Sequence, residues 1–175
     1  MKVLGVDPGM ADTGWAVLEQ VSNPPGQCLT SSGVIRTAPP RALPERLNHI
    51  HGAISEILRR FAPDSLAIEE MFFLQMAHSI RATLQARGVI LLAAAQAKVP
   101  VFEYNPGQVK SSLTGSGAAE KAQMQKMVRR TLGLAEDLRP DDVTDAAAIA
   151  ICHLRRCRFN SARVLDKVGG RGAAL

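Results

Sequence analysis

MKVLGVDPGMADTGWAV, residues 1–17, contains a short apolar run, a turn built on Asp-Pro-Gly (7–9) and the start of a second apolar run. Short apolar runs bounded by Pro and Gly are typical of β-strands joined by tight turns. A third apolar run, Cys28–Thr37, follows a further turn rich in Pro and Gly. The sequence therefore predicts a three-stranded antiparallel meander over Met1–Val6, Thr13–Gln20 and Cys28–Thr37.

Beyond residue 40 the apolar pattern becomes helical. Leu and Ile recur at three- and four-residue steps over Leu43–Phe61, which predicts an amphipathic helix. Further helices are predicted over Ala77–Lys98, over Ala118–Leu132 and from about Asp142 to residue 158, with short strands at Ser65–Ile68 and Pro100–Tyr104. Because strands separated by helices pair in parallel, we expect an α/β fold, a mixed five-stranded sheet with helices on both faces. Met1–Val6 is central in it, beside Ser65–Ile68.

The composition indicates one globular domain that binds no membrane. The chain has 175 residues, of which 46% are hydrophobic and 21% charged. The longest charge-free apolar stretch, Gly88–Ala97, is shorter than the ~20 residues of a membrane helix, and the N-terminus lacks the features of a signal peptide. The cysteines are odd in number and form no C-x-x-C motif, so we expect reduced thiols and a cytoplasmic protein. They are Cys28, Cys152 and Cys157.

The positive charge is concentrated at the C-terminal end. Residues 1–150 hold 15 basic and 15 acidic side chains, whereas residues 151–175 hold six basic and one acidic. A basic segment indicates a polyanionic partner such as nucleic acid, and a solubilising tail is the alternative. We expect a folded domain over residues 1–158 and a basic, flexible tail over residues 159–175.

Four carboxylates are expected to converge. Asp7 ends the first strand and Glu69 ends the strand placed beside it, so both lie at the same edge of the sheet. Asp142 and Asp145 are three residues apart at the start of the last helix and therefore share a face. Ala146–Ala148 follow them, and such small residues allow close packing against the sheet.

Four like charges in one cleft repel one another unless a cation binds. Oxygen ligands without His or Cys favour Mg²⁺ or Mn²⁺, and two such ions can hydrolyse a phosphodiester. Each acid also has a purely structural interpretation. Asp7 could serve only the turn, Asp141 and Asp142 could cap the helix, and Glu69 and Glu70 could be a solvated strand end. The histidines form no ligand pattern and are expected in the core or on the surface; they are His49, His51, His78 and His153.

Six segments, in order, resemble the RuvC family of Holliday-junction resolvases. They are GVDPGMADTGWAV (5–17), AIEEMFF (67–73), QARGVILLAAA (85–95), PVFEYNPGQVK (100–110), GSGAAEKAQMQKMVR (115–129) and DDVTDAAAIAICH (141–153). The resemblance implies a ribonuclease H-like fold and a homodimer that acts in recombination and DNA repair. It implies paired symmetric nicks in four-way junctions that leave 5′-phosphate and 3′-hydroxyl ends, two Mg²⁺ per subunit with Mn²⁺ as a substitute, and cooperation with the RuvA–RuvB branch-migration motor.

The resemblance also implies roles for individual residues. The family's metal-binding acids fall on Asp7, Glu69, Asp142 and Asp145, with Glu70 as the alternative to Glu69. Its lysines near the scissile phosphate fall on Lys110 and Lys121. Its aromatic residue near the junction crossover falls on Phe72, although Phe72 or Phe73 could equally pack inside. The helix around Gly88–Ala95 resembles the family's dimer interface.

Three other functions share some of these features. Actin-like and sugar-kinase ATPases also place an acid and a Gly-rich turn after the first strand, but they duplicate the fold and 175 residues hold one copy. A non-catalytic junction-binding protein does not need four acids facing phosphate. A ribonuclease or ribosomal-RNA processing nuclease of the same fold differs only in its substrate.

Overall fold

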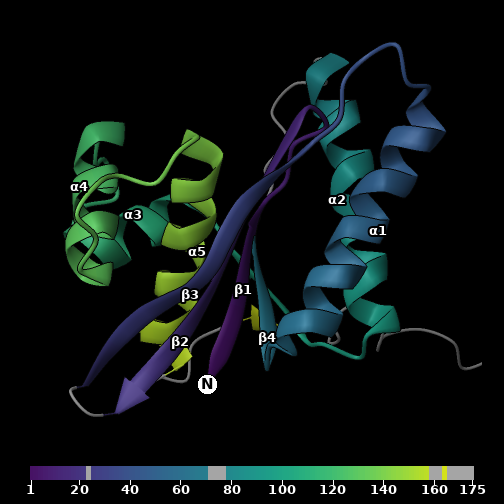
Figure 1. Cartoon of the computed structure of the whole chain (residues 1–175). Coiled ribbons are helices and arrows are strands. Elements are labelled where there is room, and N and C mark those ends of the chain that lie inside the picture. Colours follow the sequence, from purple (N-terminus) through teal and green to yellow (C-terminus); the bar gives the residue numbers. More distant parts are fainter. Residues whose placement is uncertain (23–24, 71–77, 158–162, 165–175) are drawn as a thin grey trace, which may run out of the picture.

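A computed structural model describes residues 1–22, 25–70, 78–157 and 163–164 and places one mixed sheet between two layers of helices (Figure 1). The strand order is β3-β2-β1-β4-β5-β6. The first three strands are antiparallel, and β4 and β5 continue the sheet in parallel with β1. The strands are β1 (Lys2–Asp7), β2 (Asp12–Ser22), β3 (Pro25–Arg36), β4 (Ser65–Glu69), β5 (Val101–Tyr104) and β6 (Arg163–Val164).

The predicted mixed sheet of five strands is confirmed, with β1 in its centre. The two-residue β6 pairs antiparallel with β5 and adds a short strand that was not predicted. It falls within the span expected to be a tail, and residues 158–162 and 165–175 lie outside the described part of the chain.

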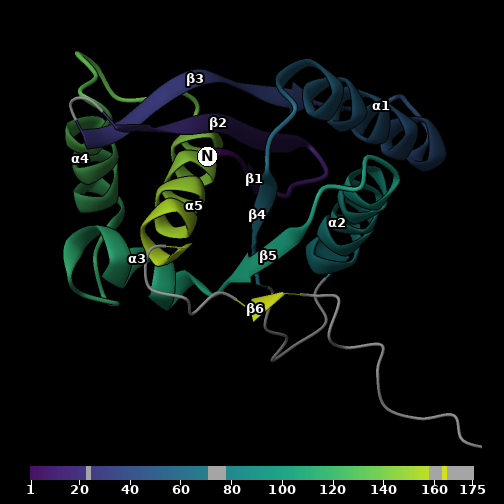
Figure 2. The same ribbon diagram turned by 90° about the horizontal axis from the view of Figure 1, so that it is seen from below.

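Two helices cover one face of the sheet and three lie on the other (Figure 2). α1 (Leu43–Phe61) and α2 (His78–Gln96) pack side by side on the first face. On the opposite face α5 (Asp141–Cys157) lies against β1 and β2, with α3 (Pro106–Thr114) and α4 (Lys121–Leu132) beyond it. No helix of the described residues is long and apolar enough to cross a membrane.

α3 is a helix that the sequence analysis did not predict. Its N-cap Asn105 accepts a hydrogen bond from the Gln108 backbone N–H at 2.8 Å, and the Gln108 side chain accepts one from the Asn105 backbone N–H at 3.3 Å. Pro106 occupies the first helical position. This reciprocal capping box starts the helix directly after β5.

Side-chain alternation along β1 divides the interior into two cores. Leu4 and Val6 face α1 and α2, whereas Val3 lies in the core that is built on α5. Because successive strand residues point to opposite faces, Asp7 shares the α5 face with Val3. The same alternation in β4 places Glu69 on the face of Ala67, which also packs with α5. The pattern therefore directs both strand carboxylates to one side of the sheet.

The core on the α5 side contains a buried polar cluster around His153. Its Nε2 lies 2.9 Å from Ser65 Oγ and its Nδ1 lies 2.7 Å from the Tyr104 hydroxyl oxygen. The ring also packs on Phe102, with 4.6 Å between ring centroids. The expectation that this histidine is a core residue holds, and burial lowers its pKa to about 4.

We expect His153 to make the fold less stable in acid. The unfolded chain binds the imidazole proton near pH 6.5 but the folded chain only near pH 4, so its contribution is complete above pH 6.5. As the pH is lowered from 6.5 to 4, the free energy of unfolding should decrease, and this residue should account for on the order of 3 kcal/mol of the decrease. Urea unfolding across this range should give a shallower pH dependence for His153→Gln. Identical pH dependences would contradict the assignment.

Candidate active site

Asp7 and Glu69 stand at the same edge of the sheet. Each is the last residue of its strand, and the residues directly before them, Val6 and Ile68, are register partners in the parallel β1–β4 pair. Neighbouring strands are ~4.8 Å apart, so two side chains on one face at this position lie close to each other. The structure thus brings together the two carboxylates that the sequence placed there.

α5 brings Asp142 and Asp145 to the same place because its backbone can approach the sheet closely. A Cβ atom at Gly5 would overlap the carbonyl oxygen of Ala146, and one at Gly14 would overlap that of Asp142. Gly14 is in turn the register partner of Asp7. The two glycines therefore let the first turns of α5 rest directly on β1 and β2, beside Asp7.

Burial and neighbouring charges raise the pKa values of Asp7, Glu69 and Asp145. Burial raises the pKa of Asp7 to about 8, and the charges of Asp145, Glu69 and then Asp142 add to the rise. Burial is also the main cause of the raised pKa of Glu69, followed by the charge of Asp145. Burial raises the pKa of Asp145, which the positive charge of Lys121 opposes. These mutual effects show that the four carboxylates share one electrostatic environment.

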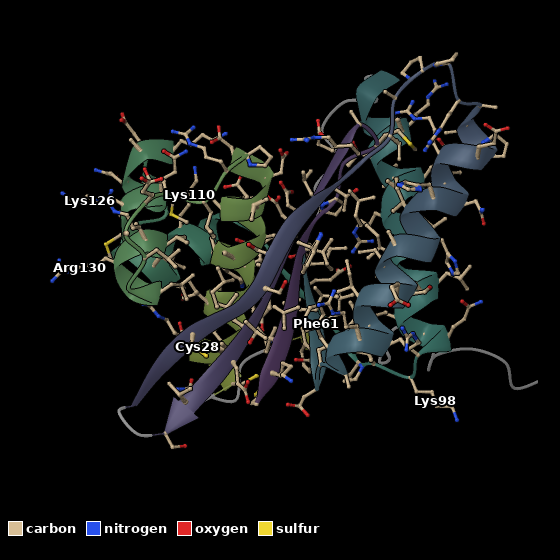
Figure 3. The ribbon with its side chains drawn as sticks, viewed as in Figure 1. Cys28, Phe61, Lys98, Lys110, Lys126 and Arg130 are labelled. Carbon is tan, nitrogen blue, oxygen red and sulfur yellow. The ribbon has the colours of Figure 1, made fainter. Side chains whose placement is uncertain are left out.

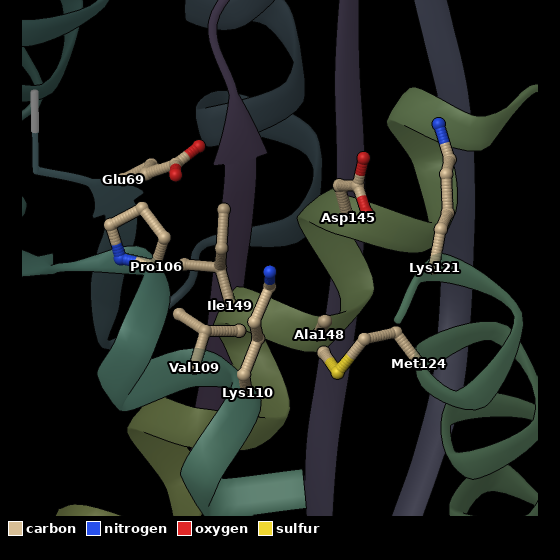
Figure 4. A pocket seen from close by; sticks show the side chains of 9 residues that line it. All are labelled: Glu69, Pro106, Val109, Lys110, Lys121, Met124, Asp145, Ala148 and Ile149. Atoms are coloured by element: carbon tan, nitrogen blue, oxygen red, sulfur yellow. The ribbon is translucent and has the colours of Figure 1, made fainter. Parts of the chain in front are cut away.

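A cavity of about 340 Å³ opens between two of these acids, Glu69 and Asp145, and two lysines (Figure 4). Glu69 and Asp145 stand apart on its rim, and the amino groups of Lys110 and Lys121 point toward the same opening. Aliphatic side chains form the rest of the wall. They are Pro106, Val109, Met124, Ala148 and Ile149.

The donor set suits a hard divalent cation. Carboxylate oxygens without Cys or His are the ligands that Mg²⁺ and Mn²⁺ prefer, and a bound cation would offset the repulsion that raises the pKa of Asp7. Among the described residues no three acidic, His or Cys side chains are grouped as a ready-made metal site. The acids therefore fit a hard cation by the chemistry of their oxygen atoms, and their present arrangement is not that of a closed metal site.

The two lysines singled out in the sequence line the same cavity as Glu69 and Asp145. Lys110 is on α3, and Lys121 is the first residue of α4 after its N-cap Glu120. The aromatic candidates Phe72 and Phe73 belong to residues 71–77, which lie outside the described part of the chain.

Asp141, for which helix capping was one alternative, is the first residue of α5, and its carboxylate contacts α4. Lys121 Nζ lies 2.9 Å from Asp141 Oδ2, and Gln125 Nε2 donates to Oδ1 at 2.9 Å. Sequence reasoning missed this contact because it joins two helices and follows no local spacing rule. It also missed the largely buried ion pair of Arg87 with Glu103, which ties α2 to β5.

Comparison with known proteins identifies the family. The model described as "Crossover junction endodeoxyribonuclease RuvC" matches residues 3–153. The chain belongs to the RuvC family. A relative of that description from Chloroflexus aggregans is 47% identical over 153 residues, which cover 87% of this chain and 92% of the relative. A second, from Salinispora arenicola, is 44% identical over 176 residues, covering 98% and 100%.

Solved structures of RuvC family members share the whole fold. The structure of Thermus thermophilus RuvC has a TM-score of 0.87 at 38% identity and covers 94% of this chain and 100% of its own. Thermus thermophilus RuvC in complex with Holliday junction substrate gives 0.86 at 36% identity, with the same coverage. The ribonuclease H-like fold that the sequence resemblance implied is confirmed.

We expect Gly14→Ala to destabilise the protein by about 1–3 kcal/mol, because the added methyl group pushes the first turn of α5 off the sheet. Chemical unfolding measures the change. Gly52→Ala is the matched control. Gly52 lies within α1, and a Cβ atom added there would meet nothing within 4 Å. The control should be as stable as the wild type or up to about 1 kcal/mol more stable. Equal effects of the two substitutions would argue against close packing at Gly14.

Proposed function

We propose that the protein resolves four-way (Holliday) DNA junctions by metal-dependent hydrolysis of phosphodiester bonds in two symmetrically placed strands, leaving 5′-phosphate and 3′-hydroxyl ends. The observation that carries this proposal is a cavity lined by Glu69, Asp145, Lys110 and Lys121, with Asp7 and Asp142 close enough to act on the same group of charges. The RuvC relatives are named as crossover junction endodeoxyribonucleases, and one was solved in complex with Holliday junction substrate. Recombination and DNA repair are the processes that use such an activity.

In this proposal the acids hold the cation and the lysines hold the phosphate. Asp7, Glu69, Asp142 and Asp145 would bind two Mg²⁺ per subunit, or Mn²⁺ in their place. Such ions supply a more acidic water molecule and positive charge at the leaving oxygen. Asp7 is half-buried at the end of the central strand, and the pleat of that strand directs its side chain to the α5 face.

Lys110 and Lys121 would stabilise the negative charge that grows on the phosphate oxygens during attack. They project from two different helices, so they can reach one phosphate from two sides (Figure 4). Aliphatic side chains line the cavity beside the two lysines.

The outer surface of α4 extends the basic surface away from the cavity. Lys126 and Arg130 are exposed, lie one helical turn apart and point outward from α4 (Figure 3). They lie on the same side of the sheet as Lys110 (Figure 3). We assign them to the sugar–phosphate backbone of a junction arm, where such contacts set orientation rather than sequence preference. Phe72, with Phe73 as the alternative, is proposed to stack on a base at the crossover.

A cytoplasmic location fits this function. Cys28, Cys152 and Cys157 are all free thiols, as a reducing compartment requires.

Asp7→Asn should abolish nicking, because it removes a central charge of the metal site while keeping the shape of the side chain. Binding of a synthetic four-way junction, measured without divalent metal, should stay within a few-fold of wild type. The cleavage assay compares the junction with a matched duplex and an RNA–DNA hybrid, each with Mg²⁺ or with EDTA.

The control for this variant is Asp64→Asn. Asp64 accepts a hydrogen bond from the Lys2 backbone N–H at 2.7 Å and lies next to the start of β4, at the end of the strand away from Glu69. This variant should cleave at the wild-type rate. Cleavage by Asp7→Asn at the full rate in EDTA would remove the metal-dependent mechanism, and preference for the RNA–DNA hybrid would favour the ribonuclease alternative.

A homodimer would place two such sites for two nicks. One face of α2 packs inside through Ala86, Ile90 and Ala94, while Leu92 on the opposite face is 51% exposed. Gly88 and Ala95 beside it are exposed too. We propose that this face of α2 meets the same face of a second subunit, since its exposed residues are small or apolar and the segment Gly88–Ala95 resembles the dimer interface of the RuvC family.

Leu92→Arg should convert the dimer into a monomer, because it puts a charge in the centre of the proposed interface. Size-exclusion chromatography with light scattering gives the mass of each form. Leu43→Arg is the matched control: Leu43 is 41% exposed at the start of α1, and its replacement should leave the mass unchanged. A wild-type protein that is monomeric at tens of micromolar, or a dimer that survives Leu92→Arg, would count against this interface.

A further inference from the structure

The Asp141 carboxylate lies between α4 and α5 and is contacted by three nitrogen donors. Lys121 Nζ contacts its Oδ2 at 2.9 Å, while Gln125 Nε2 donates to its Oδ1 at 2.9 Å. Arg139 Nη1 lies 3.5 Å from the same Oδ1. Lys121 and Gln125 are one turn apart on α4, and Asp141 is the first residue of α5. The contact therefore fixes the start of one helix against the start of the other.

This ion pair adds little to stability. The side chains of Lys121 and Asp141 are 59% and 39% exposed, and pairs exposed to that degree are weak because water screens them. The position of the pair is more informative than its strength, since Lys121 lines the cavity that Glu69 and Asp145 border.

The carboxylates of Asp145 and Asp142 also attract Lys121. The charges of Asp145 and Asp142 favour its protonated form from across the site, in addition to that of Asp141. A flexible ammonium group without Asp141 would be drawn toward this cluster. There it would neutralise the carboxylates and compete with a divalent cation for them.

We infer that Asp141 is a positioning residue, which holds the Lys121 ammonium at the rim of the cavity and keeps it off the carboxylates that bind the cation. The inference rests on the proposed function for the identity of the cation and the phosphate. A lysine has three N–H donors, so Lys121 can keep its contact with Asp141 while it donates to a phosphate oxygen. Asp141 thus sets where Lys121 meets the substrate without touching the substrate itself.

Asp141→Asn tests the inference, because asparagine keeps the size of the side chain and can still accept from Gln125 but loses the charge that holds Lys121. The first readout is Mn²⁺ binding to the free protein by electron paramagnetic resonance, where we expect at least fivefold weaker affinity. The second is single-turnover junction cleavage, where the Mg²⁺ concentration for half-maximal rate should rise by a similar factor. Junction binding without divalent metal should stay within twofold.

Three further variants separate positioning from a general structural effect. In a Lys121→Gln background, Asp141→Asn should weaken Mn²⁺ binding by less than twofold, because no ammonium is left to move. Asp141→Glu keeps the charge and should remain within twofold of wild type. Asp137→Asn is the matched control, since Asp137 also forms an ion pair with α4, to Arg129 at 3.6 Å, at the other end of that helix.

Unchanged Mn²⁺ affinity in Asp141→Asn would overturn the inference. So would an equally large loss in the Lys121→Gln background, which would mean that Asp141 acts on α5 directly. If the wild type binds Mn²⁺ and shows the expected pattern but cuts no junction, the proposed function fails while the positioning role stands.

Discussion

The close approach of α5 to the sheet is the constraint on which the rest of the structure depends. Gly5 and Gly14 leave room for the backbone of α5, and Ala146 and Ala150 are small enough to fill that room. Interiors pack like crystals, so one added methyl group here has to displace a whole helix. The distance between helix and sheet in turn decides whether Asp142 and Asp145 reach the carboxylates at the strand ends.

The alternation of side chains along β1 and β4 gives the two faces of the sheet different functions. One face of these strands packs on α1 and α2, and the other packs on α5 and carries the acids. The acidic site and the proposed dimer interface therefore lie on opposite sides of one sheet, and the strands connect them. Arg87 of α2 pairs with Glu103 of β5 on the α1 and α2 side of the sheet, since Glu103 is the register partner of Ile68, the residue before Glu69.

The parts of the fold that follow a local rule could be predicted from the sequence. Strand alternation and the order of elements placed Asp7 beside Glu69, and the helical period of residues 43–61 gave α1 with its observed ends. α3 also carried a local signal, Asn105-Pro106 with Gln108, which was overlooked because the helix is short. The ion pair between Asp141 and Lys121 could not be predicted, because its residues lie twenty positions apart and meet only through the packing of two successive helices.

The repulsion among the carboxylates destabilises the fold and, for the same reason, favours the binding of a cation. Burying Asp7 among other acids raises its pKa to about 8, so part of the folding energy is spent on holding like charges together. The surrounding aliphatic core supplies the stability that permits this arrangement. A site held under repulsion gains more from a cation than a relaxed one does, because binding removes the repulsion as well as forming new bonds. The lysines can bind a phosphate beside the cation only if their ammonium groups stay at the rim of the cavity. The placement of Lys121 is therefore as important as its charge.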